Sequence, residues 1–564
     1  MTLFDRHGMT LMRGLLGSLV LLACAAAAAA QSAHLGTVNF PTSTGSPEAQ
    51  QHFLRGVAAL HSFWYEEALD EFQAATKIDP DFMMGYWGEA MTYNHPLWAQ
   101  QDTEAGRKAV AKIKDSPKLS ERERGFLDAV KKLYGDGDKL ARDQAYSAAM
   151  EKLYKAQPDD QEAACFYALS LLGTVRPGDK GFSRQNMAGR IAQGVFKKNP
   201  DHPGAAHYII HAFDDPQHAI IALVAARRYS EIAPAAHHAR HMPSHIFLQL
   251  GMWPEAAASN ESAWAASDEW VKRKNLPLGR RDYHSLHWLL YVYLQEGRQK
   301  EAEGLLEVMR QSIRDAGGEA KLGRPVYADM AAAFIVETGR WDLADKLFAA
   351  PATAAQATGG GMAMASHCAP GATYGPAASS TLPSRSSVLT AYVKGLSAAM
   401  AGRPQVEGYV SELRGLRQRL AAGGEAYRAG EAEIMELEVT AAGLAAKGGY
   451  DEAVAQMRKA TEMEEEMSPP SGPPDLIKPS NELLGEILLR AGRPGEAAQE
   501  FETSLLRQPN RARSLLGSAR AARNMKSPQD ARAYASFWQV WSQADPQLSE
   551  LREAVEYVEK VGAQ

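Results

Sequence analysis

Cysteine is scarce in this chain of 564 residues, which contains three: Cys24, Cys165 and Cys368. Three cysteines cannot build a disulfide framework for a chain of this length, so a large apolar core must supply its stability. Cys165 and Cys368 are the two that would remain after removal of a leader sequence. Their positions leave open whether they form a disulfide, because pairing depends on distance and geometry.

Long apolar runs are missing after residue 30, where no stretch reaches the ~20 residues that a membrane-spanning helix requires. The earlier run at 14–30 follows two arginines and ends in small residues, which is typical of a secretory signal peptide over residues 1–30. We therefore expect a periplasmic or secreted protein. A lipoprotein is the alternative, because LLAC at 21–24 resembles a bacterial lipobox whose cysteine, Cys24, would carry a lipid anchor.

An excess of positive charge is also missing. The chain has 61 Lys and Arg against 67 Asp and Glu. Removal of residues 1–30 takes away two basic residues and one acid, which leaves 59 against 66 and a net charge of −7. Nucleic acid is therefore not an expected partner. The sequence also has no HExxH helix and no serine elbow, so it carries neither of these standard hydrolase motifs.

A short motif of glycine, aromatic residue and alanine recurs along the chain, in GMWPEAA (251–257), GRWDLADKLF (339–348) and GGYDEAV (448–454). Its first copy has the marks Gly56, Ala68, Phe72, Ala75 and Pro80. The pattern resembles the tetratricopeptide repeat, a unit of ~34 residues that forms two antiparallel helices. HMPSHIFLQLGMW and IKPSNELLGEILLRAGRPGEAA add a resemblance to exported bacterial tetratricopeptide proteins. The resemblance implies an all-α solenoid, a right-handed superhelix of helix pairs.

The repeat marks divide the chain into blocks. Repeats are expected to start near residues 49, 83, 127, 161, 203, 237, 283, 325, 388, 434, 478 and 512. A stretch rich in Ala, Gly, Ser and Pro interrupts them and predicts a flexible insertion or linker. We expect an N-terminal extension at 31–48, a solenoid with a histidine-rich groove at 49–350, the linker at 351–387 and a C-terminal repeat block at 388–564.

Seven of the 16 histidines fall between His207 and His245, at helical spacings of three and four. In tetratricopeptide proteins, positions 2, 5, 9, 12 and 13 of the first helix line the concave groove. The resemblance therefore implies that His218 and His237 point elsewhere and that three neighbouring repeats direct a set of candidate metal ligands into one groove. These candidates are His207, His211, Asp214, Asp215, His238, His241, His245, His284 and His287.

Imidazoles at i and i+4, such as His207 and His211, share one helical face, as in zinc sites built on helices. Helices pack ~10 Å apart, so ligands from neighbouring repeats can converge on one ion. Nitrogen ligands with an optional carboxylate from Asp214 or Asp215 suit zinc or copper better than calcium or magnesium.

Three functions are compatible with this cluster. The first is an exported scaffold whose groove holds a transition metal, a small ligand or a peptide. The second is a metal-dependent hydrolase with Asp214 or Asp215 as general base. The third is a purely structural assembly adaptor, in which the histidines satisfy buried polar groups.

Further groove positions carry aromatic and histidine side chains rather than lysine or arginine. This composition favours a protein or peptide partner with an apolar segment. Phe53 and Trp87 can equally belong to the core. The predicted groove residues of this kind are Phe53, His61, Trp87, His95 and Tyr291.

Overall fold

The computed structural model describes residues 34–176, 179, 181–316, 323–349 and 382–562. Within these ranges the chain is helical apart from loops and one antiparallel ribbon of β1 (Asn94–His95) and β2 (Gln100–Gln101). The all-α prediction is confirmed. None of the helices in these ranges combines the length and the apolar composition that crossing a membrane requires. The predicted signal peptide, Cys24 and Cys368 lie outside the described residues, so the lipid anchor and the disulfide stay predictions.

Each repeat is a pair of packed helices. The first helices are α2 (Pro47–His61), α4 (Met83–Thr92), α6 (Glu121–Leu133), α8 (Gln161–Gly173), α10 (Pro203–Ala212), α12 and α13 (His237–His241 and Pro243–Gln249), α15 (Tyr283–Gln295), α17 (Gly323–Thr338), α19 (Arg385–Met400), α21 (Ala426–Ala446), α23 (Ser480–Arg490) and α25 (Ala512–Asn524). The expected starts at 83, 161, 203, 237, 283 and 512 coincide with the first residues of their helices.

The second helices pack against the first ones, except for the four-residue helix at 344–347, whose main contacts are with the preceding 3-10 turn and with the next repeat. They are α3 (Tyr65–Ile78), α5 (Thr103–Val110), α7 (Lys139–Ala156), α9 (Ser183–Lys198), α11 (Ala219–Ile232), α14 (Trp253–Arg273), α16 (Gln299–Ala316), α18 (Ala344–Leu347), α20 (Val406–Ala422), α22 (Tyr450–Glu466), α24 (Pro494–Arg507) and α26 (Asp530–Val540), with α27 (Ser549–Gly562) after the last pair. Short 3-10 turns lie at Pro96–Trp98, Leu278–Arg280 and Trp341–Leu343.

The recurring glycine of the motif has a conformational cause. Gly251, Gly339 and Gly448 have φ values of 64°, 68° and 83° in the turns between paired helices. This left-handed conformation ends a helix and is costly for residues with a Cβ atom. Gly56, the glycine inside the first helix of the first repeat, has a steric role. A Cβ at this position would lie 2.7 Å from the ring of Phe72 on the paired helix. The motif therefore marks where the chain turns and where two helices touch.

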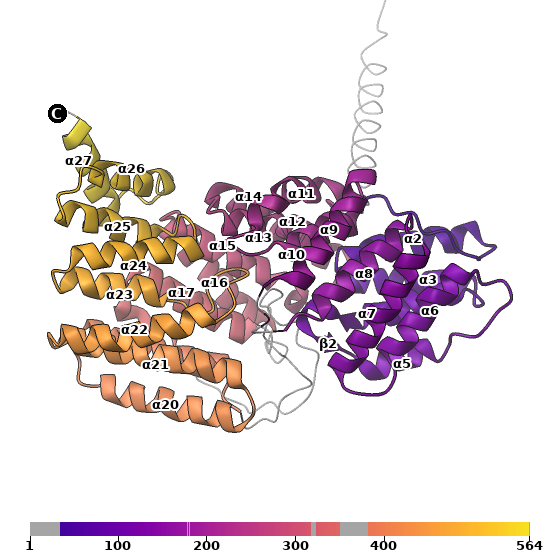
Figure 1. The fold of residues 1–564 in the computed structure, drawn as a ribbon, viewed down its shortest axis with the longest axis horizontal. Coiled ribbons are helices and arrows are strands. Elements are labelled where there is room, and N and C mark those ends of the chain that lie inside the picture. Colours follow the sequence, from indigo (N-terminus) through magenta and orange to yellow (C-terminus); the bar gives the residue numbers. More distant parts are fainter. Residues whose placement is uncertain (1–33, 177–178, 180, 317–322, 350–381, 563–564) are drawn as a thin grey trace, which may run out of the picture.

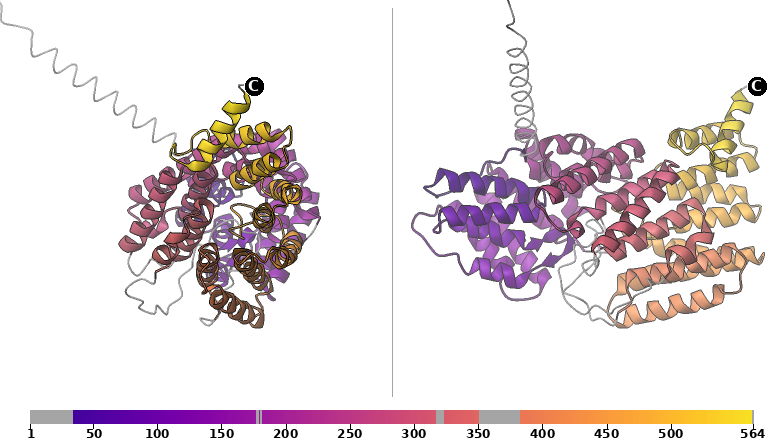
Figure 2. Two further views of the ribbon diagram at one scale, coloured as in Figure 1. Left: turned by 90° about the vertical axis from the view of Figure 1, so that its left-hand side faces the viewer. Right: turned by 180° about the vertical axis from the view of Figure 1, so that it is seen from behind.

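The repeats form an elongated molecule (Figure 1). Helices α2 to α9 lie at one end, α19 to α27 at the other, and α10 to α15 in the middle. Seen along the long axis, the helices are arranged around a ring (Figure 2, left). Buried apolar side chains form two large cores, one from Leu35 to Val271 and one from Phe247 to Ala521. The two cores meet at α13 and α14.

Segments far apart in the sequence close the solenoid at its middle. Trp253 Nε1 donates to the Asn510 carbonyl at 2.9 Å, and the Asn510 amide donates to the Gly251 carbonyl at 3.2 Å. Gln249 Nε2 donates to the Pro470 carbonyl at 2.6 Å. The C-terminal repeats therefore cover part of the inner face of the central ones.

Candidate metal centre

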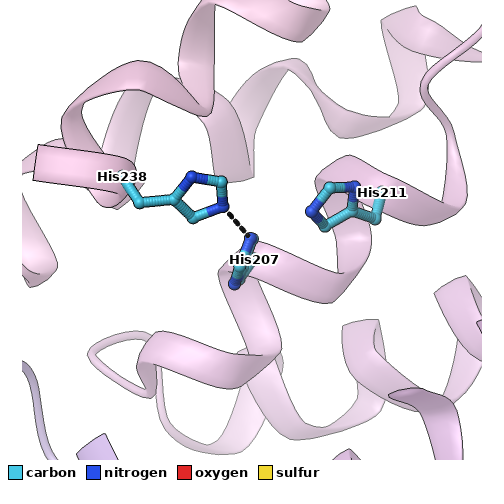
Figure 3. Close-up of side chains that lie close together, drawn as sticks. All are labelled: His207, His211 and His238. Carbon is cyan, nitrogen blue, oxygen red and sulfur yellow. Dashed lines mark hydrogen bonds between the residues drawn. The ribbon is translucent and has the colours of Figure 1, made fainter. Parts of the chain in front are cut away.

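His207 and His211 of α10 and His238 of α12 form a first trio (Figure 3), whose candidate ligand atoms all lie within 4.8 Å of one another. The two residues of α10 are one helical turn apart, so their rings lie on one face, with centroids 4.7 Å apart. His207 Nε2 lies 3.2 Å from His238 Nε2. Two neighbouring repeats thus supply one trio.

A single aromatic ring packs against the first trio. The centroid of Phe63 lies 4.3 Å from the ring of His207, 5.7 Å from His211 and 5.6 Å from His238. Phe63 lies in the turn between α2 and α3 and has a φ of 52°. Positive φ is uncommon outside glycine and costs conformational energy. In this conformation of the turn, the Phe63 ring packs against the histidines of the first trio.

His241 of α12, His245 of α13 and His284 of α15 form a second trio with the same 4.8 Å limit. The Nε2 atoms of His241 and His245 are 3.1 Å apart, and the rings of His241 and His284 are 4.6 Å apart. Trp288 packs against this trio as Phe63 does against the first. Its centroid distances are 4.2 Å to His245, 4.9 Å to His241 and 5.4 Å to His284.

Hydrogen bonds at Nδ1 orient His241 and His207. Asn260 donates its amide N–H to the Ala256 carbonyl, so its Oδ1 accepts from His241 Nδ1 at 2.6 Å. His207 Nδ1 donates to the His61 carbonyl at 2.6 Å. A neutral imidazole that donates at Nδ1 carries a lone pair on Nε2. Both rings therefore direct a ligand lone pair toward a neighbouring histidine of their own trio.

Asp214 supports His245 in the same way, with 2.6 Å between Oδ2 and Nδ1. Gln249 Nε2 donates to the other carboxyl oxygen of Asp214 at 3.2 Å. Burial raises the pKa of Asp214 well above its usual range and lowers the pKa of His245 to about 3. Burial thus works against a net charge on either group. A carboxylate on the distal nitrogen of a histidine is a common support for metal ligands.

Burial also favours the neutral form of His207 and His211 in the first trio. Burial lowers the pKa of His207 to about 3 and the pKa of His211 well below its usual range. His211 Nε2 is a buried atom that has no hydrogen-bond partner among the described residues. An unpartnered buried nitrogen costs free energy unless something binds it. Neutral imidazole is the form that binds a metal ion.

The spacings suit a metal. Two nitrogens bound at 2.0–2.1 Å to a tetrahedral ion lie about 3.3 Å apart. The closest Nε2 pairs of the two trios are 3.2 Å and 3.1 Å apart. An N–H···N hydrogen bond has a similar length, so the metal-free chain keeps the same arrangement when one ring of each pair carries the proton at Nε2.

Besides Asp214, which contacts His245 from outside the trios, two predicted ligands belong to neither trio. Asp215 accepts from the backbone N–H groups of Gln217 and His218 and pairs with His218 Nδ1 at 2.9 Å. Its position therefore serves the start of α11. Burial lowers the pKa of His287, and the charged group that opposes this effect is Asp329. The sequence spacing could not separate these two residues from the others, because both lie at groove positions of the repeat.

His61 takes part in a third buried group, with Glu162 and His202, that the sequence did not indicate. Glu162 bridges His61 Nε2 at 2.8 Å and His202 Nε2 at 3.2 Å, and His61 Nδ1 lies 2.8 Å from the Tyr208 hydroxyl. Although burial opposes it, the histidines lower the pKa of Glu162. Hydrogen bonds already occupy these ligand atoms, so the group is a structural ion-pair network behind the first trio.

Three of the remaining predicted groove residues pack inside the protein, and His95 is half-buried. Phe53 and Trp87 are 0 % exposed, because Phe40 of the N-terminal extension lies 5.1 Å and 5.5 Å from their rings and fills the inner face. Tyr291 is buried, and its hydroxyl accepts from Arg511 at 3.0 Å. His95 stacks on Tyr65 at 3.9 Å. The structure thus replaces the expected open groove with a covered interior.

These helix pairs form a helical-repeat solenoid, and its recurring sequence motif resembles the tetratricopeptide repeat. No protein-family model and no curated protein matches the chain. The solved structures that it resembles include Ypp1, with a TM-score of 0.42 and 13 % identity over 91 % of this chain and 88 % of that one. The APC/C hetero-tetramer Cut9–Hcn1 matches with a TM-score of 0.34 and 10 % identity, over 91 % of this chain and 76 % of that one. Yeast Tom70 matches with a TM-score of 0.22 and 11 % identity, over 92 % of this chain and 90 % of that one.

Proposed function

We propose that this helical-repeat scaffold binds a transition metal through the buried histidines at its middle. The observation that carries the proposal is the pair His241 and His245, whose Nε2 atoms face each other at 3.1 Å while Asn260 and Asp214 hold their Nδ1 atoms. The unpartnered Nε2 of His211 supports a second set of ligands in the first trio.

The donor set favours zinc or copper. Each trio offers three imidazole nitrogens, which suit these borderline ions, and a tetrahedral ion would keep one open position. Hydrolysis at that position needs a general base within reach of the bound water. Asp214 is bonded to His245 and Gln249, and Asp215 to His218. Both carboxylates are therefore engaged elsewhere, and metal binding without turnover is the function that the geometry favours.

Export is part of the proposal, because the apolar stretch at residues 14–30 resembles a signal peptide. The metal would then be acquired outside the cytoplasm. Fractionation of cells that produce the untagged chain tests this point, with the expectation that the mature protein leaves the cytoplasm. Retention of the whole pool in the cytoplasm contradicts it.

Metal content tests the central claim. The mature chain is purified without a histidine tag, incubated with Zn²⁺ or Cu²⁺, desalted and analysed for elements. At least one equivalent of metal per chain is expected, since buried histidine sites bind tightly. Less than about a tenth of an equivalent after both incubations overturns the proposal and leaves the adaptor function.

Two neighbouring aspartates give a matched pair of variants. Asp214→Asn removes the carboxylate that orients His245, so zinc affinity in a chelator competition should fall about 10–100-fold. Asp215→Asn changes a side chain that serves the start of α11, and the asparagine oxygen can still accept from the same backbone N–H groups, so the affinity should stay within about twofold and the stability within about 1 kcal/mol of the wild type. Equal losses of affinity in the two variants would contradict the assigned role of Asp214.

A further inference from the structure

The two trios are one continuous cluster of six imidazoles. Between the trios, the rings of His211 and His245 are 5.9 Å apart, and the rings of His238 and His241 are 6.1 Å apart. Within the trios the closest ring distances are 4.7 Å and 4.6 Å. The step from one trio to the other is therefore only slightly longer than a step inside a trio.

The local fold explains this closeness. Helix α12 has five residues, and it places His238 and His241 one turn apart, each in a different trio. The chain continues through Pro243 into α13, which supplies His245 one turn later. Helix α10 completes the first trio and α15 the second. The short helix α12 thus contributes one histidine to each trio.

Each trio is complete by itself. It has three imidazoles and its own covering aromatic ring, Phe63 for the first and Trp288 for the second. The candidate ligand atoms of these histidines fall into two groups of three, each with its members within 4.8 Å of one another, and among the described residues no group of this kind combines histidines of both trios. The geometry therefore provides for two ions.

We propose that the cluster is a dinuclear centre that holds two copper ions, one in each trio, close enough to interact. This inference rests on the proposed metal binding and adds the number of ions and their identity. Two-metal sites have their ions ~3.5–4 Å apart, with one small ligand between them. The facing rings His211 with His245 and His238 with His241 form the junction where such a ligand would lie.

Charge favours copper in its monovalent state. Asp214 is bonded to His245, and Asp282 lies beside the second trio at the start of α15, where it pairs with His237 at 3.2 Å. Even if both carboxylates are counted as charged, two divalent ions leave at least two excess positive charges in a buried site. Two monovalent copper ions leave two fewer than that, and uncompensated buried charge is costly.

Stoichiometry gives the first test. The untagged mature chain is loaded without oxygen with Cu(I), and separately with Zn²⁺, and then desalted. We expect two copper ions per chain and no more than one zinc ion. The variants His211→Gln and His284→Gln, one from each trio, should each retain one copper ion and the helical circular-dichroism signal of the wild type.

Sharing of one unpaired electron gives the second test. The chain loaded with Cu(I) is oxidised by one electron with ferricyanide, and its electron paramagnetic resonance spectrum should show one spin whose hyperfine pattern arises from two copper nuclei, because the paired ions share it. Each single-trio variant should show one spin with hyperfine splitting from one copper nucleus. One copper ion in the wild type, two copper ions with a hyperfine pattern from one nucleus, or two zinc ions bound as readily as two copper ions would overturn the dinuclear copper centre. Binding of no metal at all would instead overturn the proposed function itself.

Discussion

Glu438 is a fully buried carboxyl group in α21, far along the chain from the histidines. Tyr392 donates its hydroxyl to Oε2 at 2.5 Å, and Ser480 donates to Oε1 at 2.8 Å. Burial raises the pKa of Glu438 from 4.5 to about 8, with the neighbouring Glu464 acting in the same direction. The native protein therefore keeps Glu438 protonated at a pH where the unfolded chain ionises it.

This shift predicts that the stability of the protein falls as the pH rises from 4.5 to about 8. A raised folded pKa gives a stabilising contribution that is present below pH 4.5 and declines as the pH rises to about 8. The slope is about 1.4 kcal/mol per pH unit. Glu438→Gln should remove this slope, so that the variant gains thermal stability relative to the wild type between pH 5 and pH 8. The exposed Glu466 serves as control in Glu466→Gln, and parallel curves for both variants and the wild type would contradict the prediction.

The spacing of residues in the sequence predicted the six histidines of the cluster, but not that they form two separate trios. Helical periodicity and the repeat register selected all six histidines of the two trios, because both act on local sequence. Glu162, His202, Asn260 and Phe63 carry no such signal. They come from other helices or turns, and their contacts depend on packing between repeats. Phe63 in particular depends on a positive φ in a turn that has no glycine at that position.

The loop at 468–479 is the element that covers the second trio. Its Pro470 carbonyl accepts from Gln249, and a Cβ at Gly472 would lie 2.4 Å from Trp288 Cζ2. Ser471 and Gly472 are buried. The loop can approach the tryptophan this closely because residue 472 has no side chain.

Gly472→Ala should therefore push Trp288 away from His245 and His284. We expect a loss of about 1–3 kcal/mol in stability from overpacking and a loss of the second copper ion, with the first ion retained. Gly430→Ala is the matched control, because nothing lies within 4 Å of a Cβ at that helical position. It should leave copper binding unchanged and raise stability by roughly 0.5–1 kcal/mol. Full copper content in Gly472→Ala would show that the loop does not position Trp288 for binding.

The repeat motif predicted the first residue of several helices correctly. Where a capping residue determines the start of a helix, the observed start differs from the predicted one. Helix α6 begins at Glu121 instead of near 127, because Ser120 and Glu123 form a capping box there. The sequence SERE carries that signal, so the start could have been found. Helix α21 begins eight residues before its expected start at 434, within a 21-residue helix that the 34-residue unit does not foresee.

At the scale of the whole molecule, Arg511 ties the C-terminal repeats to the middle of the solenoid. Its guanidinium is 0 % exposed and lies 2.7 Å from Glu482, 2.6 Å from Glu337 and 3.0 Å from the Tyr291 hydroxyl. These partners belong to α23, α17 and α15. Four helices from distant parts of the chain therefore meet at one cation.

Arg511→Met should lower the unfolding free energy by about 3–5 kcal/mol, because it leaves buried carboxylates without their cation. Arg520→Met is the comparison: Arg520 pairs with Glu553 at 2.7 Å, but its side chain is 44 % exposed. An exposed pair is worth at most about 1 kcal/mol. Thermal unfolding of both variants measures the difference, and melting temperatures lowered to the same extent would contradict the role of Arg511.

Closure of the solenoid was beyond the reach of the repeat pattern. A 34-residue period predicts contacts between neighbouring repeats, whereas Asn510 with Gly251 and Pro470 with Gln249 join residues more than 200 positions apart. An open groove was the natural expectation, and the N-terminal extension and the 468–479 loop fill it instead. The same closure turns predicted surface residues such as Tyr291 into buried ones.

Closure also sets an order in which the parts of the cluster can open. The first trio lies within the N-terminal core, whereas the second is covered by Ser471 and Gly472, which lie more than 180 positions further along the chain. If the C-terminal repeats come loose while the N-terminal repeats stay folded, the second trio is uncovered and the first is not. Exchange of material with the surrounding solution should therefore be faster at the second trio than at the first.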